Sequence, residues 1–358
     1  MGCNIDRRGF LAGTAAAAVA LAGGRARAAS PPSLGFVYVG PVGDFGWSYQ
    51  HELGRRAVQA KFGDKVKTHY VENVAEGPDS ERVFRQLAAS GDAMIFATSF
   101  GYMNPALRVA QQFPNVKFEI ATGYKTLPNA AEYNARFYQG RAVCGTIAGA
   151  VSKKGFCGYV APFPIPEVVM GVNAFTIAAR KVNPNFRTKI IWVNTWFDPG
   201  KEADAAKSLI DQGADVIAQH TDSPAAMQTA QSRGVYAFGQ DSDMRKFGPT
   251  AQLTAIINNW APYYVERTQA LLDGTWKTQS VWYGLKEGMV ELAPFGPGVT
   301  PAAQQAADKV KQGIIDGTLY PFEGPVNDAK GALKVAAGTH PSDHDLLTMN
   351  WYVEGVQA

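Results

Sequence analysis

The 358-residue sequence predicts an α/β fold of two similar lobes, each a doubly wound parallel sheet, with a cleft between the lobes. Three observations predict this class. Short apolar runs alternate with helical patterns, which is typical of a parallel sheet with helices on both faces. The alternation starts again after the first third of the chain. The length suits two domains of about 100–200 residues each.

The first series of elements occupies the N-terminal third of the chain. Apolar runs predict four strands, at 34–39, 66–71, 93–97 and 116–120. The stretches between them have helical periodicity and predict three helices, at 47–61, 78–90 and 103–112. A strand that alternates with a helix in this way builds βαβ units.

The second series repeats this arrangement. The predicted helices are at 138–151, 166–180, 200–211, 223–232 and 261–272. The predicted strands are at 158–161, 189–193, 214–218 and 234–238, with one more at 346–353. We therefore expect an N-terminal lobe over 29–135 and a C-terminal lobe over 136–254, with 255–358 divided between the two and a first crossing near 130–137. Ligands of open α/β sheets bind where the strand carboxyl ends meet, and two lobes of this kind close over them by a hinge.

Residues 1–28 have the charged, apolar, small-residue order of a cleaved secretory signal. The pair Arg7-Arg8, followed by Phe10-Leu11, resembles a twin-arginine signal, and cleavage is expected near Ala28. The apolar run is too short for the alternative, a membrane anchor. We therefore expect a soluble periplasmic protein.

The charge of the remaining chain is balanced. Four of the 34 Lys and Arg residues and one of the 31 Asp and Glu residues lie in 1–28, which leaves 30 of each sign. A large electrostatic surface for nucleic acid or anionic membrane is therefore not expected.

Two cysteines lie beyond the signal segment, Cys144 on a predicted helix and Cys157 on the next strand. An oxidising compartment permits a disulfide between them, and two buried free thiols are the alternative. Neither has a neighbouring His, so neither is expected to be a nucleophile.

Aromatic and acidic residues follow the predicted strands, with few Lys or Arg among them. The candidates are Asp44, Trp47, Phe100, Tyr102, Trp196, Asp198, Asp222 and Asp241. Aromatic faces stack on a flat ring and carboxylates accept its N–H groups, whereas a phosphorylated ligand needs basic residues or a Gly-rich nest. This lining predicts a planar, neutral, hydrogen-bonding ligand. The alternatives are core packing for the tryptophans and helix N-caps for Asp44, Asp198 and Asp222.

Catalysis has weak support in the sequence. His220-x-Asp222 fits either a catalytic general-base pair or hydrogen bonding in the cleft. Asp343-His344-Asp345 fits either a metal site or a solvated loop. The Asp241-Ser-Asp243 segment fits a cap better than a metal pair, since hard cations need about six oxygens. No serine elbow, zinc-protease motif or phosphate loop occurs. We expect a non-enzyme with no cofactor and no metal.

Seven motifs in order along the chain resemble the basic membrane protein family, the substrate-binding proteins of ABC importers related to purine nucleoside receptor lipoproteins of spirochaetes. They are Gly40–Trp47, Tyr138–Arg141, Pro164–Val168, Asn173–Phe175, Asn194–Pro199, Gln219–Asp222 and Asp241–Asp243. The resemblance implies a type I periplasmic binding protein fold with three crossovers, which hands its ligand to a permease in the inner membrane and usually works as a monomer.

The resemblance also implies roles for particular residues. By motif position, Trp47 and Trp196 stack on the two faces of a purine, Asp241 contacts ribose, and Asp44 and Asp222 are polar contacts. Asn258 aligns with the family's ribose-binding Lys, with bulky Trp260 nearby. This departure favours a free purine base, with adenine preferred. The alternatives are a nucleoside receptor, a receptor for a thiamine- or flavin-like ring, and a periplasmic nucleoside hydrolase.

Overall fold

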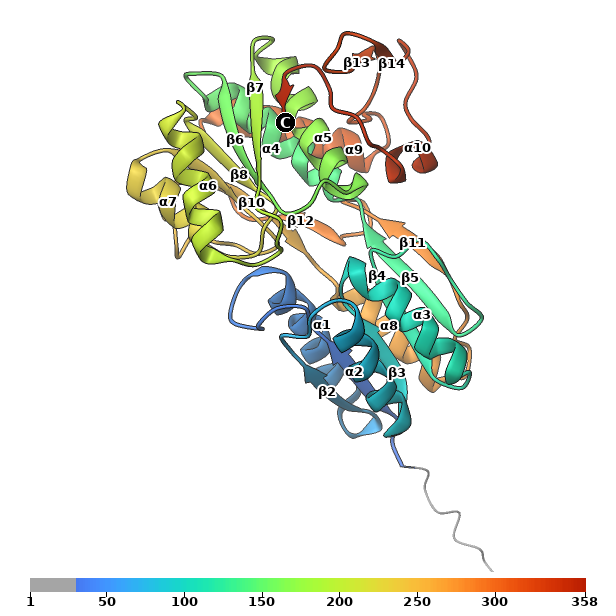
Figure 1. Ribbon diagram of the computed structural model, residues 1–358. Helices are drawn as coiled ribbons and strands as arrows, with labels where there is room; N and C mark the ends of the chain where they lie inside the picture. Colours follow the sequence, from blue (N-terminus) through green and yellow to red (C-terminus); the bar gives the residue numbers. More distant parts are fainter. Residues whose placement is uncertain (1–29) are drawn as a thin grey trace, which may run out of the picture. The chain divides into compact units, whose positions relative to one another are not determined.

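The computed structural model describes residues 30–358, of which Pro32–Ala358 form one compact unit (Figure 1). The predicted signal segment and its cleavage site lie outside the described residues. The described chain builds two sheets, which we call the sheets of the N-lobe and the C-lobe, and a small two-stranded sheet near its C-terminus (β13, Val326–Asn327, and β14, Leu333–Val335).

The N-lobe sheet has the strand order β11-β5-β4-β3-β1-β2, and all of its pairs are parallel. Its strands are β1 (Ser33–Val37), β2 (Lys67–Val71), β3 (Asp92–Ala97), β4 (Lys117–Ala121), β5 (Ala130–Ala135) and β11 (Ser280–Tyr283). Its helices are α1 (Gly46–Phe62), α2 (Pro78–Ala89), α3 (Met103–Gln112) and α8 (Ala261–Leu272).

Side chains that alternate along the N-lobe strands enter two different cores. Phe36 and Phe96 belong to the core that includes Val58 of α1, whereas Val37 and Ile95 pack with α2 and α3. Helices therefore cover both faces of the sheet. This double burial explains why the strands are near-continuous apolar runs.

The C-lobe sheet has the order β12-β10-β9-β8-β6-β7-β15, parallel except for the pair of β10 with β12. Its strands are β6 (Phe156–Ala161), β7 (Arg187–Trp192), β8 (Val216–Gln219), β9 (Tyr236–Gly239), β10 (Gln252–Asn258), β12 (Val290–Leu292) and β15 (Val356–Gln357). Its helices are α4 (Phe137–Val151), α5 (Pro166–Val182), α6 (Pro199–Asp211), α7 (Ala225–Arg233) and α9 (Pro301–Ile315).

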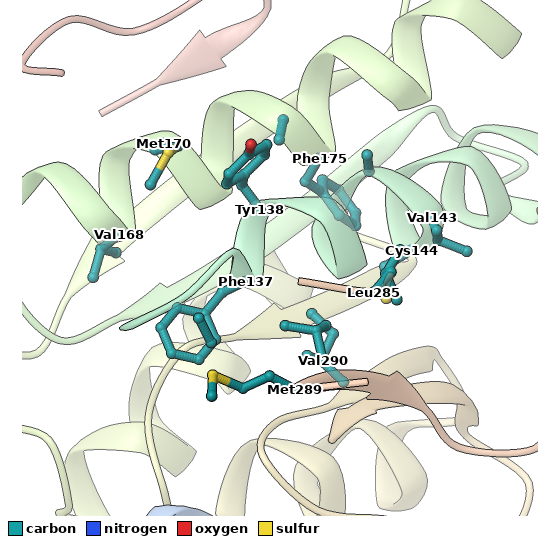
Figure 2. Packing of buried hydrophobic residues seen from close by; sticks show 14 of the residues in the cluster. Phe137, Tyr138, Val143, Cys144, Val168, Met170, Phe175, Leu285, Met289 and Val290 are labelled. Carbon is teal, nitrogen blue, oxygen red and sulfur yellow. The ribbon is translucent and has the colours of Figure 1, made fainter. Parts of the chain in front are cut away.

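Helices α4 and α5 approach each other closely over the apolar cluster that Figure 2 shows. A Cβ on Gly145 would lie 2.1 Å from the Phe175 carbonyl oxygen, and one on Gly149 would lie 2.5 Å from that of Ala179. Only glycine permits this backbone contact. Phe175 and Val143 fill the adjacent core, together with the buried thiol of Cys144.

The two lobes share one topology. Strands β2-β1-β3-β4-β5 and β7-β6-β8-β9-β10 have the same doubly wound order, whose switch point lies between the first and third strands of each set. Within the described residues the chain passes between the sheets after β5, after β10 and after β11. The ligand crevice of such sheets lies at the carboxyl ends of these strands.

Most predicted elements agree with the structure to within a few residues, but the strand at 346–353 is wrong. Ser342 instead begins a short helix, α10 (Asp343–Leu347), through a reciprocal capping box with Asp345. The prediction also missed several elements, among them β5 and α9. In the described part of the chain, no helix combines the length and hydropathy that a membrane span requires.

The structure decides between the two readings of the cysteines. Cys144 and Cys157 are both buried and both free. Burial raises the pKa of the Cys144 thiol to about 12, so it stays protonated and unreactive.

Candidate functional site

A small cavity lies between the lobes, with about 30 Å³ of space for water-sized groups. The N-lobe side is Val39, Trp47, Ser99, Phe100 and Thr122, and the C-lobe side is Glu167, Trp196, His220, Asp222, Gln240 and Asp241. Each of these residues lies in the segment that follows the carboxyl end of a strand. The cavity is therefore at the place where doubly wound sheets bind ligands.

Trp47 enters the cavity from the first turn of α1. Its indole Nε1 donates to the Thr98 carbonyl oxygen at 2.6 Å, and its ring meets the edges of His51 and Trp260. His51 in turn stacks on Trp260 with ring centroids 4.8 Å apart. These contacts hold the half-buried Trp47 ring in one orientation before any ligand arrives.

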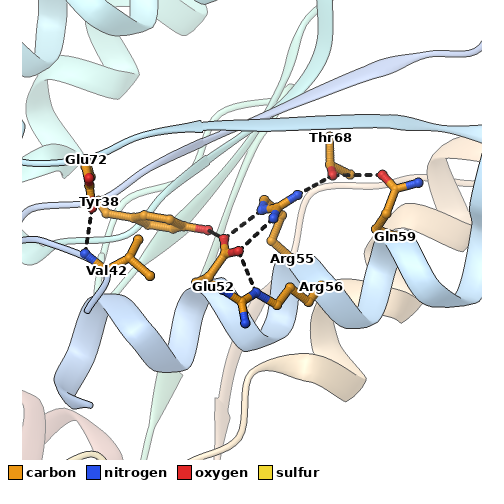
Figure 3. Close-up of polar contacts among 8 residues, drawn as sticks. All are labelled: Tyr38, Val42, Glu52, Arg55, Arg56, Gln59, Thr68 and Glu72. Carbon is orange, nitrogen blue, oxygen red and sulfur yellow. Dashed lines mark hydrogen bonds and ion pairs between the residues drawn. The ribbon is translucent and has the colours of Figure 1, made fainter. Parts of the chain in front are cut away.

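Helix α1 and the loop before it are held by a charged network (Figure 3). The Glu52 carboxylate accepts from Tyr38 at 3.1 Å, from Arg55 at 2.6 Å and from Arg56 at 2.8 Å. The backbone N–H of Val42 donates to Glu72 at 2.7 Å. The network ties α1 and its preceding loop to β1 and β2, so it positions the residues next to Trp47.

Trp196 enters from the opposite lobe, on the loop after β7. Its carbonyl oxygen accepts from the Asp222 N–H at 2.9 Å, and its ring packs edge-on against Phe163 at 5.4 Å. Both tryptophans are half-buried and both line the same cavity. Two aromatic faces from two lobes are an arrangement that can enclose a flat ring.

A pair of carboxyl groups lies on the C-lobe side. Asp222 and Asp241 lie close enough for the charge of Asp241 to raise the pKa of Asp222, so the two carboxyl groups do not ionise together. Asp241 Oδ1 accepts from Asn258 and from Gln240, each at 2.6 Å. Asp241 is therefore the ionised partner and Asp222 the protonated one.

The pKa values agree with this assignment. Burial, and next the charge of Asp241, raise the pKa of Asp222 well above its usual range. Burial raises the pKa of Asp241 to about 7, and the Arg141 guanidinium and the hydrogen bond from Asn258 limit that rise. Two neighbouring carboxylates that are shielded from water repel each other, so one of the two carboxyl groups stays protonated.

Arg141 is a fully buried cation behind the cavity. Its guanidinium donates to Gln240 Oε1, whereas its Nε and one terminal nitrogen have no partner among the described residues. His220 lies nearby, since a Cβ on Gly171 would meet both Arg141 and His220. Burial, and next the charge of Arg141, lower the pKa of His220, so this imidazole is neutral.

The structure brings five of the nine predicted site residues to the cavity: Trp47, Phe100, Trp196, Asp222 and Asp241. Asn258 does not line the cavity, but its amide donates to Asp241, which does. The other three do not line it, and each makes a structural contact elsewhere.

Tyr102 is buried in the N-lobe core, where its hydroxyl donates to the Val74 carbonyl oxygen at 2.5 Å. Asp198 is the N-cap of α6 and accepts from the Lys201 N–H, as its position before a helix allows. Asp44 is exposed and pairs with Lys246 of the other lobe.

Six lining residues were not among the predicted site residues: Val39, Ser99, Thr122, Glu167, His220 and Gln240. His220 and Gln240 lie directly after the carboxyl ends of β8 and β9, where the sequence predicted ligand contacts. Glu167 lies in the first turn of α5, beyond the loop after β6, where an acidic residue reads as ordinary helix chemistry.

The two lobes touch beside the cavity. The Gly46 N–H and the Gln50 amide donate to Ser242 Oγ at 2.8 and 2.9 Å, and Phe45 meets the Phe247 ring edge-on at 5.0 Å. Gly46 has φ +81°, and a Cβ there would lie 2.8 Å from the Asp222 carbonyl oxygen. Glycine is therefore needed both for the turn and for the close approach of the lobes.

Metal binding has no support in the described residues, which hold no group of three or more His, Cys, Asp or Glu side chains suited to a metal ion. Asp343 pairs instead with Arg136, and Asp345 with the Ser342 cap.

Comparisons with known proteins agree with this geometry. The model of the PnrA-like ABC transporter substrate-binding protein family matches residues 32–330. The chain is 54% identical to a purine-binding protein of Brucella abortus (strain 2308), over 93% of this chain and 95% of that one. It is 38% identical to a putative ABC transporter glucose-binding protein of Haloferax volcanii, over 90% of this chain and 79% of that one.

Solved structures show the same fold at low sequence identity. An ABC transporter solute-binding protein from Aeropyrum pernix K1 superposes with a TM-score of 0.71 at 18% identity, over 88% of this chain and 95% of that one. A transcriptional activator of the comK gene from Bacillus halodurans gives 0.68 at 20% identity, over 81% and 100%. These likenesses confirm the predicted two-lobed α/β fold class.

Proposed function

Because the chain belongs to the family of PnrA-like ABC transporter substrate-binding proteins, as its motifs predicted, we propose that it captures a free purine base and delivers it to a membrane permease. Members of this family bind substrates for import rather than transform them. The proposal concerns which ligand this chain carries and how it is held.

The observation that carries the proposal is the pair of tryptophans. Trp47 and Trp196 line one cavity from opposite lobes, so a flat ring can bind to one and be covered by the other when the lobes close. Stacking of a base on an aromatic side chain contributes about 1–3 kcal/mol. The name of the 54% identical Brucella protein supports a purine as that ring.

The polar surroundings favour a base over its nucleoside. Asn258 is fully buried and bonded to Asp241, and Trp260 is fully buried behind Trp47. In the family motif the acid and a lysine would hold ribose. Here Asn258 stands at the position of that lysine and donates to Asp241 Oδ1, so a sugar lacks the ammonium group that would bind it. Adenine, with ring nitrogens as acceptors and N–H groups as donors, is the purine we favour.

Export is part of the proposal. ABC substrate-binding proteins are extracytoplasmic, and residues 1–28 have the sequence of a twin-arginine signal. We propose that the mature chain is periplasmic and presents its closed form to the permease as a monomer.

Thermal unfolding of the mature protein, stripped of ligand by denaturation and refolding, tests the proposal. A ligand at 100 times its dissociation constant adds about 2.7 kcal/mol to stability. The expected result is a clear shift with adenine and a small one with adenosine. A shift with glucose alone would overturn the purine assignment, and a shift with nucleosides alone would overturn the preference for the base. If a thiamine- or flavin-like compound raises the unfolding temperature while purines do not, the ligand is a different flat ring held between the same tryptophans. Conversion of adenosine to adenine would indicate a hydrolase.

A further inference from the structure

Glu167 is a cavity residue with no assigned role. It lines the cavity, its side chain is 13% exposed, and in the described residues its carboxyl group makes no hydrogen bond to protein. The nearest basic atom, His220 Nε2, is 3.8 Å from Oε1, which is too far for a hydrogen bond. A buried carboxyl group without a protein partner costs free energy unless a ligand supplies one.

The surroundings of Glu167 decide its protonation. From the segment after β8 it faces neutral His220 and protonated Asp222. From the segment after β9 it faces Asp241, which ionises near pH 7, and from α4 the cation Arg141. The N-lobe side of the cavity contributes no charged residue. Asp241 and Arg141 therefore oppose each other, which leaves no cation to balance a second carboxylate.

We propose that Glu167 binds the edge of the ligand ring as a neutral carboxylic acid, with its O–H donating to a ring acceptor and its C=O accepting from the neighbouring N–H. This inference rests on the proposed function, because it takes the ring to be a purine base. It names the ligand class as a neutral ring with an acceptor nitrogen or oxygen beside an N–H donor. Every free purine base has such an edge.

The electrostatics support the proposal. Burial, and next the charge of Asp241, raise the pKa of Glu167 to about 8, against the smaller opposing influence of Arg141. The group is therefore protonated at neutral pH and ionises just above it. Ionisation removes the donor and places a second uncompensated anion in the cavity.

The variant Glu167→Gln tests the proposal, because an amide also offers one donor and one acceptor at the same place but does not titrate. Adenine affinity of the full mature chain is measured by calorimetry from pH 6 to pH 9.5. We expect the wild-type affinity to fall about tenfold per pH unit above pH 8, and the affinity of Glu167→Gln to stay within about threefold of the wild-type value at pH 7. The ratio of the wild-type affinity to the Glu167→Gln affinity is taken at each pH. This ratio removes the effects of adenine ionisation and of Asp241 ionisation, which both proteins share.

Glu167→Ala is the matched loss variant, with an expected drop of tenfold or more at pH 7 and a pH profile like that of Glu167→Gln. A base methylated at N9 and dimethylated at N6 has ring acceptors but no N–H donor. The wild-type advantage over Glu167→Ala should shrink for this base.

Two outcomes overturn the inference while the proposed function stands. One is a wild-type pH profile that Glu167→Gln reproduces. The other is a loss for Glu167→Gln at pH 7 as large as that for Glu167→Ala. If no purine binds the wild-type protein at any pH, the proposed function itself fails.

Discussion

Each lobe buries an arginine beside carboxyl groups, and the two clusters differ in how completely they are paired. In the N-lobe, Glu119 accepts from Arg267 at 2.6 Å, from Tyr263 at 2.7 Å and from Trp276 at 2.6 Å. In the C-lobe, Arg141 has two nitrogens without a partner among the described residues. The paired cluster supports the fold. The incompletely paired one lies beside the ligand cavity, where unused hydrogen-bonding capacity is available for binding.

The largest expected effect separates the two clusters. Arg267→Met leaves Glu119 buried without its cation, and we expect a loss of about 3–5 kcal/mol in the free energy of unfolding. Adenine affinity per folded molecule should change little, because Arg267 is not among the residues that line the cavity. Chemical denaturation together with calorimetry measures both quantities.

Arg141→Met is the matched variant. We expect it to lower adenine affinity. We also expect it to raise the pKa of Asp241, because the Arg141 charge holds that pKa down. The difference between the clusters is disproved if Arg267→Met weakens binding as much as Arg141→Met does.

The aromatic walls come next in expected size. Trp47→Ala and Trp196→Ala should each reduce ligand affinity by about 1–3 kcal/mol, because each removes one stacking face. Trp351→Ala is the control, since Trp351 is also half-buried but lies in the C-terminal segment away from the cavity. Trp47→Ala and Trp196→Ala proteins that both bind as tightly as the Trp351→Ala control would exclude the sandwich.

The pH dependence of stability sharpens the comparison further. Glu167 and Asp241 have folded-state pKa values of about 8 and about 7, above the range of unfolded carboxyl groups. Each therefore contributes stability that is complete at acidic pH and is lost as the pH rises through the folded pKa. We expect the ligand-free protein to lose stability between pH 5 and pH 8 and Glu167→Gln to lose less. A wild-type stability that rises steadily over this range would contradict the assignment.

The contacts between the lobes carry the smallest expected effects. Ser242→Ala removes the acceptor for Gly46 and Gln50, and we expect about 1 kcal/mol less favourable binding, because the closed form loses these bonds. Asp44→Asn breaks only an exposed ion pair and should cost below about 1 kcal/mol, with an effect that salt removes. Affinities measured at low and high salt separate the two. An effect of Asp44→Asn larger than that of Ser242→Ala would reverse this ranking.

The sequence predicted the parts of the molecule that repeat a pattern. Apolar strands buried on both faces, such as β3 and β6, stand out as continuous runs, and Trp47 follows a strand of this kind, β1. It could not predict β5, whose sequence Ala-Ala-Glu-Tyr-Asn-Ala carries polar residues that the lobe interior and the neighbouring strands accommodate.

Two kinds of site residue show the limits. Asp198 and Asp222 both precede helices and look alike in the sequence, yet Asp198 caps α6 and Asp222 lines the cavity beside Asp241. Glu167 lies within the Pro164–Val168 motif but was not singled out, because an acid at a helix start is ordinary. The sequence does not show that its carboxyl group lines the cavity without a hydrogen-bond partner.

The most direct test of the central claim is a crystal structure of the mature protein grown with adenine. We predict the purine ring between Trp47 and Trp196, with a polar edge of the ring against Glu167. Adenine bound outside this cavity, or in contact with only one of the two tryptophans in a closed molecule, would contradict the proposed sandwich.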